Sequence, residues 1–207
     1  MKLTLPSVAL GLATLGSAQY DTESKPFRLV LVSKNHTING QTLSACHSGA
    51  AIESLCLSKL PSTSKPDPIA AATFRFNTSA DTQPPSGSDG APGILTYKLQ
   101  SSPPIPSSMQ FSYDPTNNYA LPLMFPGTGA DTQTLSFDKK GLLNIQGYVN
   151  YTTSPPTAME APKAFYNWYA CQTYYSGYEY PNLVWALGGD KPLTPGCAKV
   201  DVKRVWV

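Results

Sequence analysis

The sequence predicts an all-β protein: a single antiparallel β-sandwich or β-barrel domain of about ten strands with long Pro/Ser-rich loops. Short runs of β-branched, aromatic and aliphatic residues recur at close spacing along the 207-residue chain, and most of them alternate with period two. Only residues 48–57 offer a run of helical length. A β-trefoil is the alternative, although the chain lacks the internal repeat that would favour one.

Residues 1–18 have the three parts of a secretory signal peptide. Lys2 supplies a positive start, residues 3–15 are mostly apolar, and residues 16–18 are small. The apolar run is too short for a membrane span, which needs about 20 residues. We therefore expect a secreted, extracellular protein with one all-β domain over residues 19–207 and no membrane span. Three acceptor sequons for N-glycosylation agree with export: Asn35, Asn77 and Asn150.

The composition excludes several classes of protein. Charged residues make up only 14% of the chain, and 15 Lys and Arg nearly balance 13 Asp and Glu. A nucleic-acid binder needs clustered positive charge, so none is expected as a partner. The chain has two histidines, and His47 adjoins a cysteine that we expect to be oxidised. No metal site and no cofactor are therefore predicted.

Four cysteines allow three disulfide pairings. Short loops close at lower entropic cost, which favours Cys46–Cys56 together with Cys171–Cys197. One straight helix over residues 46–56 would hold the first two sulfurs about 15 Å apart. A disulfide needs Cα atoms within about 7 Å, so the pairing excludes that helix. It predicts a hairpin through residues 47–49.

Strand signals run through the first half of the chain. Residues 27–32 are apolar on both faces, as in a central strand. Asn39-Gly40, between residues 37–38 and 41–43, is the strongest short hairpin signal.

Further strands are predicted by alternation at residues 73–76, 93–99, 109–113, 119–125, 135–137 and 142–145. Turns separate the later ones at residues 114–118 and 138–141, the second closed by a glycine bulge. Surface loops are expected where Pro, Ser and Gly gather, at residues 61–68, 78–93, 101–108 and 152–162.

Residues 165–185 contain nine aromatic side chains. Ser176-Gly177 reads as a two-residue hairpin turn. Pairing back from this turn places Trp168 opposite Trp185 and Tyr174 opposite Glu179. Both faces of this hairpin are aromatic, so one face can stack on sugar rings or on a partner protein. The other interpretation, which we favour, is that both faces simply pack. The candidate binding residues are Tyr166, Trp168, Tyr174, Tyr178 and Tyr180.

Candidate catalytic residues are not identified by the sequence. Glu179 lies among tyrosines, where a raised pKa would suit a general acid. Glycosidase chemistry also needs a second carboxylate across a cleft, and no local pattern places one. An exposed strand residue is the favoured interpretation of Glu179.

The C-terminal strand breaks its alternation at Arg204-Val205. Either a bulge resets the register, or Arg204 stacks on an aromatic ring and finds a buried acceptor. The bulge is slightly preferred.

Three segments resemble a family of small secreted proteins of filamentous ascomycete fungi: residues 46–53, 168–178 and 197–205. That family is of unknown function, so it supplies no catalytic residues. Residues 72–74 add a likeness to fungal cell-wall proteins. Together the resemblances imply a fungal, secreted, wall-associated protein.

The function expected from the sequence is that of a secreted, disulfide-bonded glycoprotein without enzymatic activity. It would bind cell-wall polysaccharide or an extracellular protein through the aromatic hairpin. Two alternatives remain: a small secreted hydrolase that uses unidentified carboxylates, and a purely structural wall protein.

Overall fold

The computed structural model describes residues 20–58, 69–80, 82–86, 90–129 and 131–207, so the expected signal peptide lies outside them. The described residues form strands and turns and contain no helix, which confirms the all-β prediction. Accordingly, this part of the chain contains no helix that could cross a membrane. The strands are β1 (Thr22–Glu23), β2 (Phe27–Val32), β3 (Leu43–Gly49), β4 (Ile52–Leu57), β5 (Arg75–Thr78), β6 (Gly93–Leu99), β7 (Ile105–Asp114), β8 (Tyr119–Pro126), β9 (Thr134–Phe137), β10 (Leu143–Asn150), β11 (Thr157–Phe165), β12 (Trp168–Tyr175), β13 (Tyr178–Ala186), β14 (Ala198–Lys199) and β15 (Asp201–Trp206).

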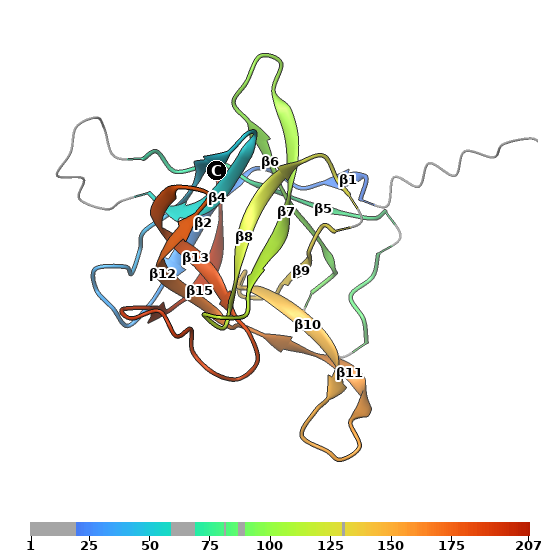
Figure 1. Ribbon diagram of the computed structural model, residues 1–207. Helices are drawn as coiled ribbons and strands as arrows, with labels where there is room; N and C mark the ends of the chain where they lie inside the picture. Colours follow the sequence, from blue (N-terminus) through green and yellow to red (C-terminus); the bar gives the residue numbers. More distant parts are fainter. Residues whose placement is uncertain (1–19, 59–68, 81, 87–89, 130) are drawn as a thin grey trace, which may run out of the picture.

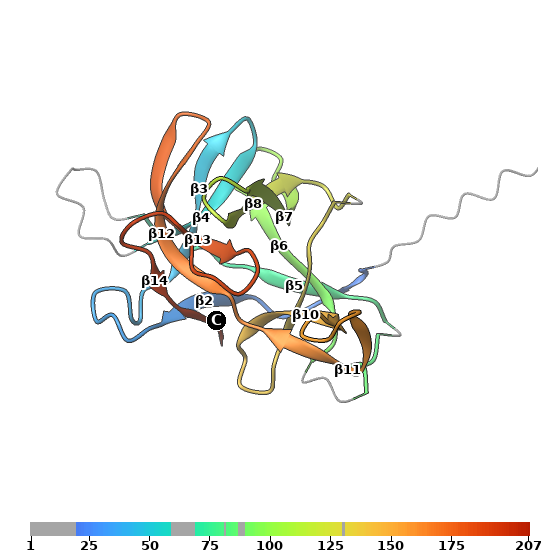
Figure 2. The ribbon, with the colours of Figure 1, turned by 60° about the horizontal axis from the view of Figure 1, so that its bottom comes forward.

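Thirteen strands form one antiparallel sheet that curls into a half-barrel (Figures 1 and 2). Its main path runs β11-β10-β9-β6-β7-β8-β4-β13-β12-β14, while β5 and β1 extend from β6, and β3 pairs with β4. Strand β8 pairs with β7, β4 and β13, so it joins the two halves of the path. Strands β2 and β15 pair in a separate two-stranded sheet. This architecture is the expected sandwich or barrel class and not the trefoil.

The apolar side chains form two clusters. The larger one is built from inward-facing residues of both sheets, and its largest member is the fully buried Trp168. The smaller cluster includes Leu121, Leu123, Cys171 and Val184. Strands β8, β12 and β13 therefore bury both of their faces over part of their length, which is why apolar residues there do not alternate cleanly with polar ones.

Both disulfides join the favoured partners. Cys46 pairs with Cys56 at a Cα separation of 5.9 Å, and Cys171 pairs with Cys197 at 4.4 Å. The first disulfide lies within the β3–β4 hairpin, which agrees with the prediction that residues 46–56 do not form one helix. The turn of that hairpin is displaced from the predicted residues 47–49, because β3 continues to Gly49 and Ala51 takes the positive φ of 58°.

Strand β2 has the predicted bounds but not the predicted burial. Leu29 and Leu31 are fully buried, whereas Arg28 and Val32 are exposed. The strand lies in the two-stranded sheet and covers the core with one face only. The expectation of a central strand buried on both faces was therefore wrong.

The Asn39-Gly40 signal marks a loop and not a tight hairpin. The flanking residues 37–38 are in turns, and the loop closes where Leu31 exchanges backbone hydrogen bonds with Gly40 and Gln41. The Asn39 side chain accepts a hydrogen bond from the backbone N–H of Ser33. Such side-chain bonds stabilise a wide loop in place of a two-residue turn.

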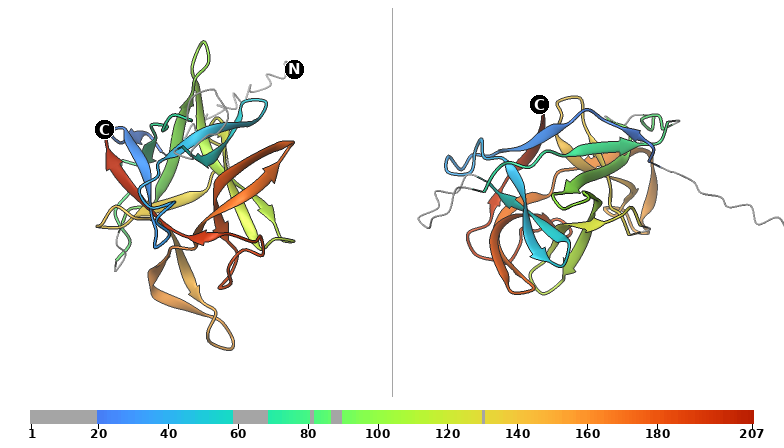
Figure 3. Two further views of the ribbon diagram at one scale, coloured as in Figure 1. Left: turned by 90° about the vertical axis from the view of Figure 1, so that its left-hand side faces the viewer. Right: turned by 90° about the horizontal axis from the view of Figure 1, so that it is seen from above.

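The Pro-rich stretch predicted as a loop at residues 152–162 contains the start of β11. This strand pairs with β10 across a register shift, and the β10–β11 hairpin projects from the body (Figures 1 and 3). Likewise, β7 begins at Ile105, within the predicted loop 101–108. In both places cross-strand pairing overrides the local loop composition.

Strand β15 pairs with β2 without a bulge, from Asp201–Val32 to Trp206–Phe27. The preferred explanation for the broken alternation was therefore wrong. The guanidinium of Arg204 instead lies over aromatic rings, 4.4 Å from the centroids of both Phe137 and Trp206. Burial lowers the pKa of Arg204, and these cation–π contacts offset part of the cost of desolvating the charge.

Candidate functional site

The β12–β13 hairpin has the predicted register along its whole length. Trp168 lies opposite Trp185, and Tyr174 lies opposite Glu179. Residues opposite each other share a face, so Tyr174 and Trp168 lie on one face of the hairpin. Tyr178 and Tyr180 lie on the other face. The hairpin therefore separates the predicted binding residues into two groups.

Trp168 is not a surface residue. Its side chain has 0% exposure and packs edge-to-face on Trp185, with ring centroids 4.8 Å apart. Its indole N–H donates a hydrogen bond of 2.8 Å to the carbonyl of Leu143. A residue enclosed in this way cannot contact a ligand, so its inclusion among the binding residues was wrong.

Tyr178 and Tyr180 form a pair that we call the tyrosine platform. Their rings are nearly parallel, with 8° between the planes and 6.5 Å between the centroids. Both rings are half-buried. The imidazole of His47 meets Tyr178 edge-on at 5.1 Å, which joins the tip of the β3–β4 hairpin to the tip of β12–β13 (Figure 2).

The other two predicted tyrosines lie apart from this platform. Tyr174 is 68% exposed, on the opposite face of the hairpin, beside the exposed Glu179. Tyr166 precedes β12 and donates a hydrogen bond of 3.0 Å to the carboxylate of Asp138 in the β9–β10 turn. Tyr166 therefore belongs to the base of the hairpin, away from its tip.

Glu53 is a functional candidate that the sequence analysis missed. It is only 9% exposed, and its Oε2 atom is buried without a hydrogen-bond partner in the described chain. Burial raises the pKa of Glu53 to about 7. The sequence did contain a signal: Glu53 shares the period-two phase of Leu55 and Leu57, both buried in β4.

A carboxyl group with this pKa can donate a proton at neutral pH, as a glycosidase acid must. A glycosidase also needs a second carboxylate about 5–10 Å away. Burial is the sole cause of the shift within the described residues, and no neighbouring charge adds to it. A paired carboxylate beside Glu53 would have added one. The described residues therefore supply no second carboxylate whose charge acts on Glu53.

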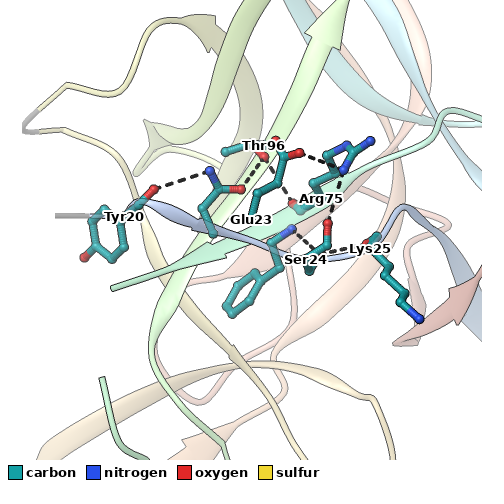
Figure 4. Close-up of polar contacts among 8 residues, drawn as sticks. Tyr20, Glu23, Ser24, Lys25, Arg75 and Thr96 are labelled. Atoms are coloured by element: carbon teal, nitrogen blue, oxygen red, sulfur yellow. Dashed lines mark hydrogen bonds and ion pairs between the residues drawn. The ribbon is translucent and has the colours of Figure 1, made fainter. Parts of the chain in front are cut away.

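A groove of about 270 Å³ opens between β5, β6 and the start of β7. Most of its lining residues carry polar groups, although the surface that they present to the groove is mainly apolar, and Figure 4 shows the polar contacts at one end. The lining residues are Glu23, Thr73, Arg75, Asn77, Thr96, Tyr97, Lys98, Gln100, Pro106, Ser107 and Thr128. Sequence reasoning did not find this groove, because its residues come from separate strands.

Hydrogen bonds position the polar groups of the groove. Arg75 Nη1 lies 2.7 Å from the carboxylate of Glu23 and donates a hydrogen bond to the carbonyl of Ser24. The hydroxyl of Thr96 donates to Asn77 Oδ1 at 3.0 Å, which links β6 to β5. Burial raises the pKa of Tyr97, and the nearby charge of Glu53 raises it further. In the described ranges no three His, Cys, Asp or Glu side chains group together.

The three glycosylation sequons differ in their surroundings. At Asn35 and Asn150 the side-chain oxygen accepts bonds from the backbone N–H and the hydroxyl of the threonine two residues later, Thr37 and Thr152. Asn35 lies in an exposed loop, and Asn150 is the half-buried last residue of β10, next to an exposed turn. Asn77 lies within β5, is paired on both sides, and lines the groove.

When the chain is expressed through a secretory pathway, we therefore expect glycan on Asn35 and Asn150 but not on Asn77. The side-chain nitrogen of Asn77, to which a glycan would be attached, donates a hydrogen bond to the carbonyl of Tyr20, and the side chain lines the groove. Peptide mapping after enzymatic deglycosylation in heavy-oxygen water, which labels each occupied asparagine, would measure this. Full occupancy of Asn77 would contradict the placement of its side chain against Tyr20 and Thr96.

Comparison with known proteins places the chain in a family. A family model described as "Domain of unknown function (DUF7907)" matches residues 24–206. The chain belongs to this family. The match extends from just before β2 to the end of β15, so it includes the aromatic hairpin, both disulfides and most of the groove. Searches of curated proteins and of solved structures gave no match. The resemblance to a family of unknown function agrees with this result, while fungal origin and secretion stay predictions.

Proposed function

We propose that the chain is a secreted, non-enzymatic protein that binds a cell-wall polysaccharide through the tyrosine platform. The observation that carries this proposal is the nearly parallel orientation of the Tyr178 and Tyr180 rings on one strand. Aromatic side chains combine a large apolar face with a polar tip. Neighbouring rings of this kind can accept successive sugar rings, whose C–H groups pack on the aromatic faces while their hydroxyls meet the phenol groups.

The platform is held rigidly before any ligand arrives. The hairpin register is regular from base to tip, and the Cys171–Cys197 disulfide anchors β12. The edge contact of His47 fixes the ring of Tyr178 from the neighbouring hairpin. Such preorganisation lowers the entropic cost of binding, which supports a binding role for these rings.

Extracellular location is supported by chemistry as well as by the N-terminal sequence. All four cysteines are paired in disulfides. Disulfides persist mainly in oxidising compartments, and the polysaccharides of a cell wall lie in such surroundings. An extracellular location is thus consistent with a cell-wall polysaccharide as the ligand.

A pull-down on insoluble chitin, β-glucan and cellulose tests the proposal. The mature, oxidised protein is expected to be retained on at least one of them. Tyr178→Ala and Tyr180→Ala should each weaken that retention about twofold to tenfold, since an aromatic contact contributes about 0.5–1.5 kcal/mol beyond its buried area.

Tyr174→Ala is a matched control, because it removes an exposed tyrosine from the opposite face of the same hairpin. Tyr113→Ala removes a tyrosine of similar exposure, 64%, from β7. Both variants should be retained like the wild type. Loss of binding in Tyr174→Ala with normal binding in Tyr178→Ala would contradict the platform. No retention on any of the three polysaccharides would rule out this ligand class.

A further inference from the structure

The polar groove is a second candidate binding site, and it is independent of the tyrosine platform. Its residues come from β1, β5, β6 and the start of β7, whereas the platform belongs to β13. Its volume of about 270 Å³ suits one sugar-sized molecule. Small-ligand pockets typically combine a mainly apolar wall with a few placed polar groups, and this groove has that composition.

The polar groups are fixed by contacts that leave part of their bonding capacity unused. Arg75 engages Glu23 and the Ser24 carbonyl through Nη1 alone, so Nε and Nη2 have no partner within the described chain. The Arg75 side chain is 34% exposed and lines the groove, and Figure 4 shows its contacts with Glu23 and Ser24. An arginine fork held by one nitrogen can still offer two donors to a carboxylate.

The charges in the groove do not balance. Glu23 is paired with Arg75 at 2.7 Å, which leaves the ammonium of Lys98 as surplus positive charge. Among the residues that the structure describes, Lys98 makes no ion pair. One negative charge on a ligand would restore the balance. The remaining lining groups are hydroxyls and amides, which suit the hydroxyls of a ligand, and the ring of Tyr97 supplies an apolar wall.

We propose that this groove binds a small polyhydroxylated acid, with a hexuronic acid unit as its simplest representative. The ligand carboxylate meets Lys98 and the free nitrogens of Arg75. The ligand hydroxyls meet the second carboxylate oxygen of Glu23 and the side chains of Asn77 and Thr96. This assignment does not depend on polysaccharide binding at the tyrosine platform, so either can fail while the other stands.

Two ligands that differ mainly in their charge test the assignment. Glucuronate and methyl glucoside are titrated into the isotope-labelled, oxidised chain, and backbone amide shifts are followed by NMR. Glucuronate should shift the amides of β5 and β6 around Arg75 and Lys98, and it should bind at least about fivefold more tightly than methyl glucoside. Equal affinity for both ligands would overturn the acidic class. No saturable shift at the groove with either ligand would overturn the site.

Two substitutions with opposite expected effects complete the test. Lys98→Ala removes the surplus charge and should weaken glucuronate binding about threefold to fivefold. Glu23→Gln keeps an amide oxygen that can accept from the ligand hydroxyls but removes the charge that competes for Arg75, so it should strengthen glucuronate binding by a similar factor. A nonspecific loss of structure would weaken binding in both variants, and that result would contradict the proposal. Tyr178→Ala, which alters only the platform, should leave glucuronate binding unchanged, and a loss there would also contradict it.

Discussion

Trp168→Ala is expected to lower the free energy of unfolding by about 3–5 kcal/mol, the usual range for truncating a large buried aromatic residue. The indole is fully buried at the base of the hairpin. It packs on Trp185 and approaches Phe111, with ring centroids 6.3 Å apart. The substitution removes these contacts, leaves a cavity, and deprives the Leu143 carbonyl of its donor. Chemical denaturation followed by fluorescence of the remaining tryptophans would measure the change.

Two further variants make the test of Trp168 sharper. Trp168→Phe keeps most of the apolar volume but removes the N–H group that donates to the Leu143 carbonyl. We expect it to lower the free energy of unfolding by about 1–3 kcal/mol. Tyr174→Ala, on the same face but 68% exposed, should change stability by less than about 0.5 kcal/mol. If Trp168→Ala proves too unstable to purify, the phenylalanine variant still reports on the site. Wild-type stability in both Trp168 variants would contradict the buried position.

Glu53→Gln is expected to remove a pH dependence of stability. Burial raises the pKa of Glu53 in the folded chain to about 7, from its ordinary value of 4.5. Between these values the unfolded chain has released the proton while the folded chain still holds it. Folding therefore becomes less favourable as the pH rises from about 4.5 to about 7 and changes no further above that. Over this pH range the free energy of unfolding falls by about 3 kcal/mol.

Denaturation curves at pH 4 and pH 8 measure this effect as a difference. The free energy of unfolding of Glu53→Gln minus that of the wild type should increase by about 3 kcal/mol from pH 4 to pH 8. The remaining residues are the same in both proteins, including His47 opposite Glu53 and the nearby Tyr97, so the difference reports on Glu53 and its interactions. Glu179→Gln, at an exposed position, is the control and should show no such growth. If the stability difference between Glu53→Gln and the wild type is the same at pH 4 and pH 8, the Glu53 carboxyl group is hydrated or paired.

Much of the strand pattern could be predicted from local sequence. The bounds of β2 and β6 match the predicted ranges, and the register of β12–β13 follows from the Ser176-Gly177 turn alone. A two-residue turn leaves only one register for the strands that it joins, so a local signal settles every pair in that hairpin. The disulfide pairs were predictable for a similar reason, since short loops close easily.

The candidate sites were much less predictable. Trp168 and Tyr178 stand ten residues apart in one aromatic segment, yet one is buried in the core and the other lies at the hairpin tip. Which part of a strand is covered depends on the neighbours that pack there, and these come from distant strands. The groove illustrates the same point, because Glu23, Arg75 and Lys98 meet only after β1, β5 and β6 have paired.

The sequence by itself determined the all-β class, the positions of most strands, the disulfide pairs and the register of the aromatic hairpin. Each of these depends on interactions between residues close in the chain: alternation along one strand, a two-residue turn or a short closed loop. Only the tertiary structure decided that a Pro-rich stretch forms β11, that Arg204 lies on aromatic rings, and that Glu53 is buried without a partner. These features depend on contacts between segments far apart in sequence, because burial and cross-strand pairing outweigh the local preferences of each residue.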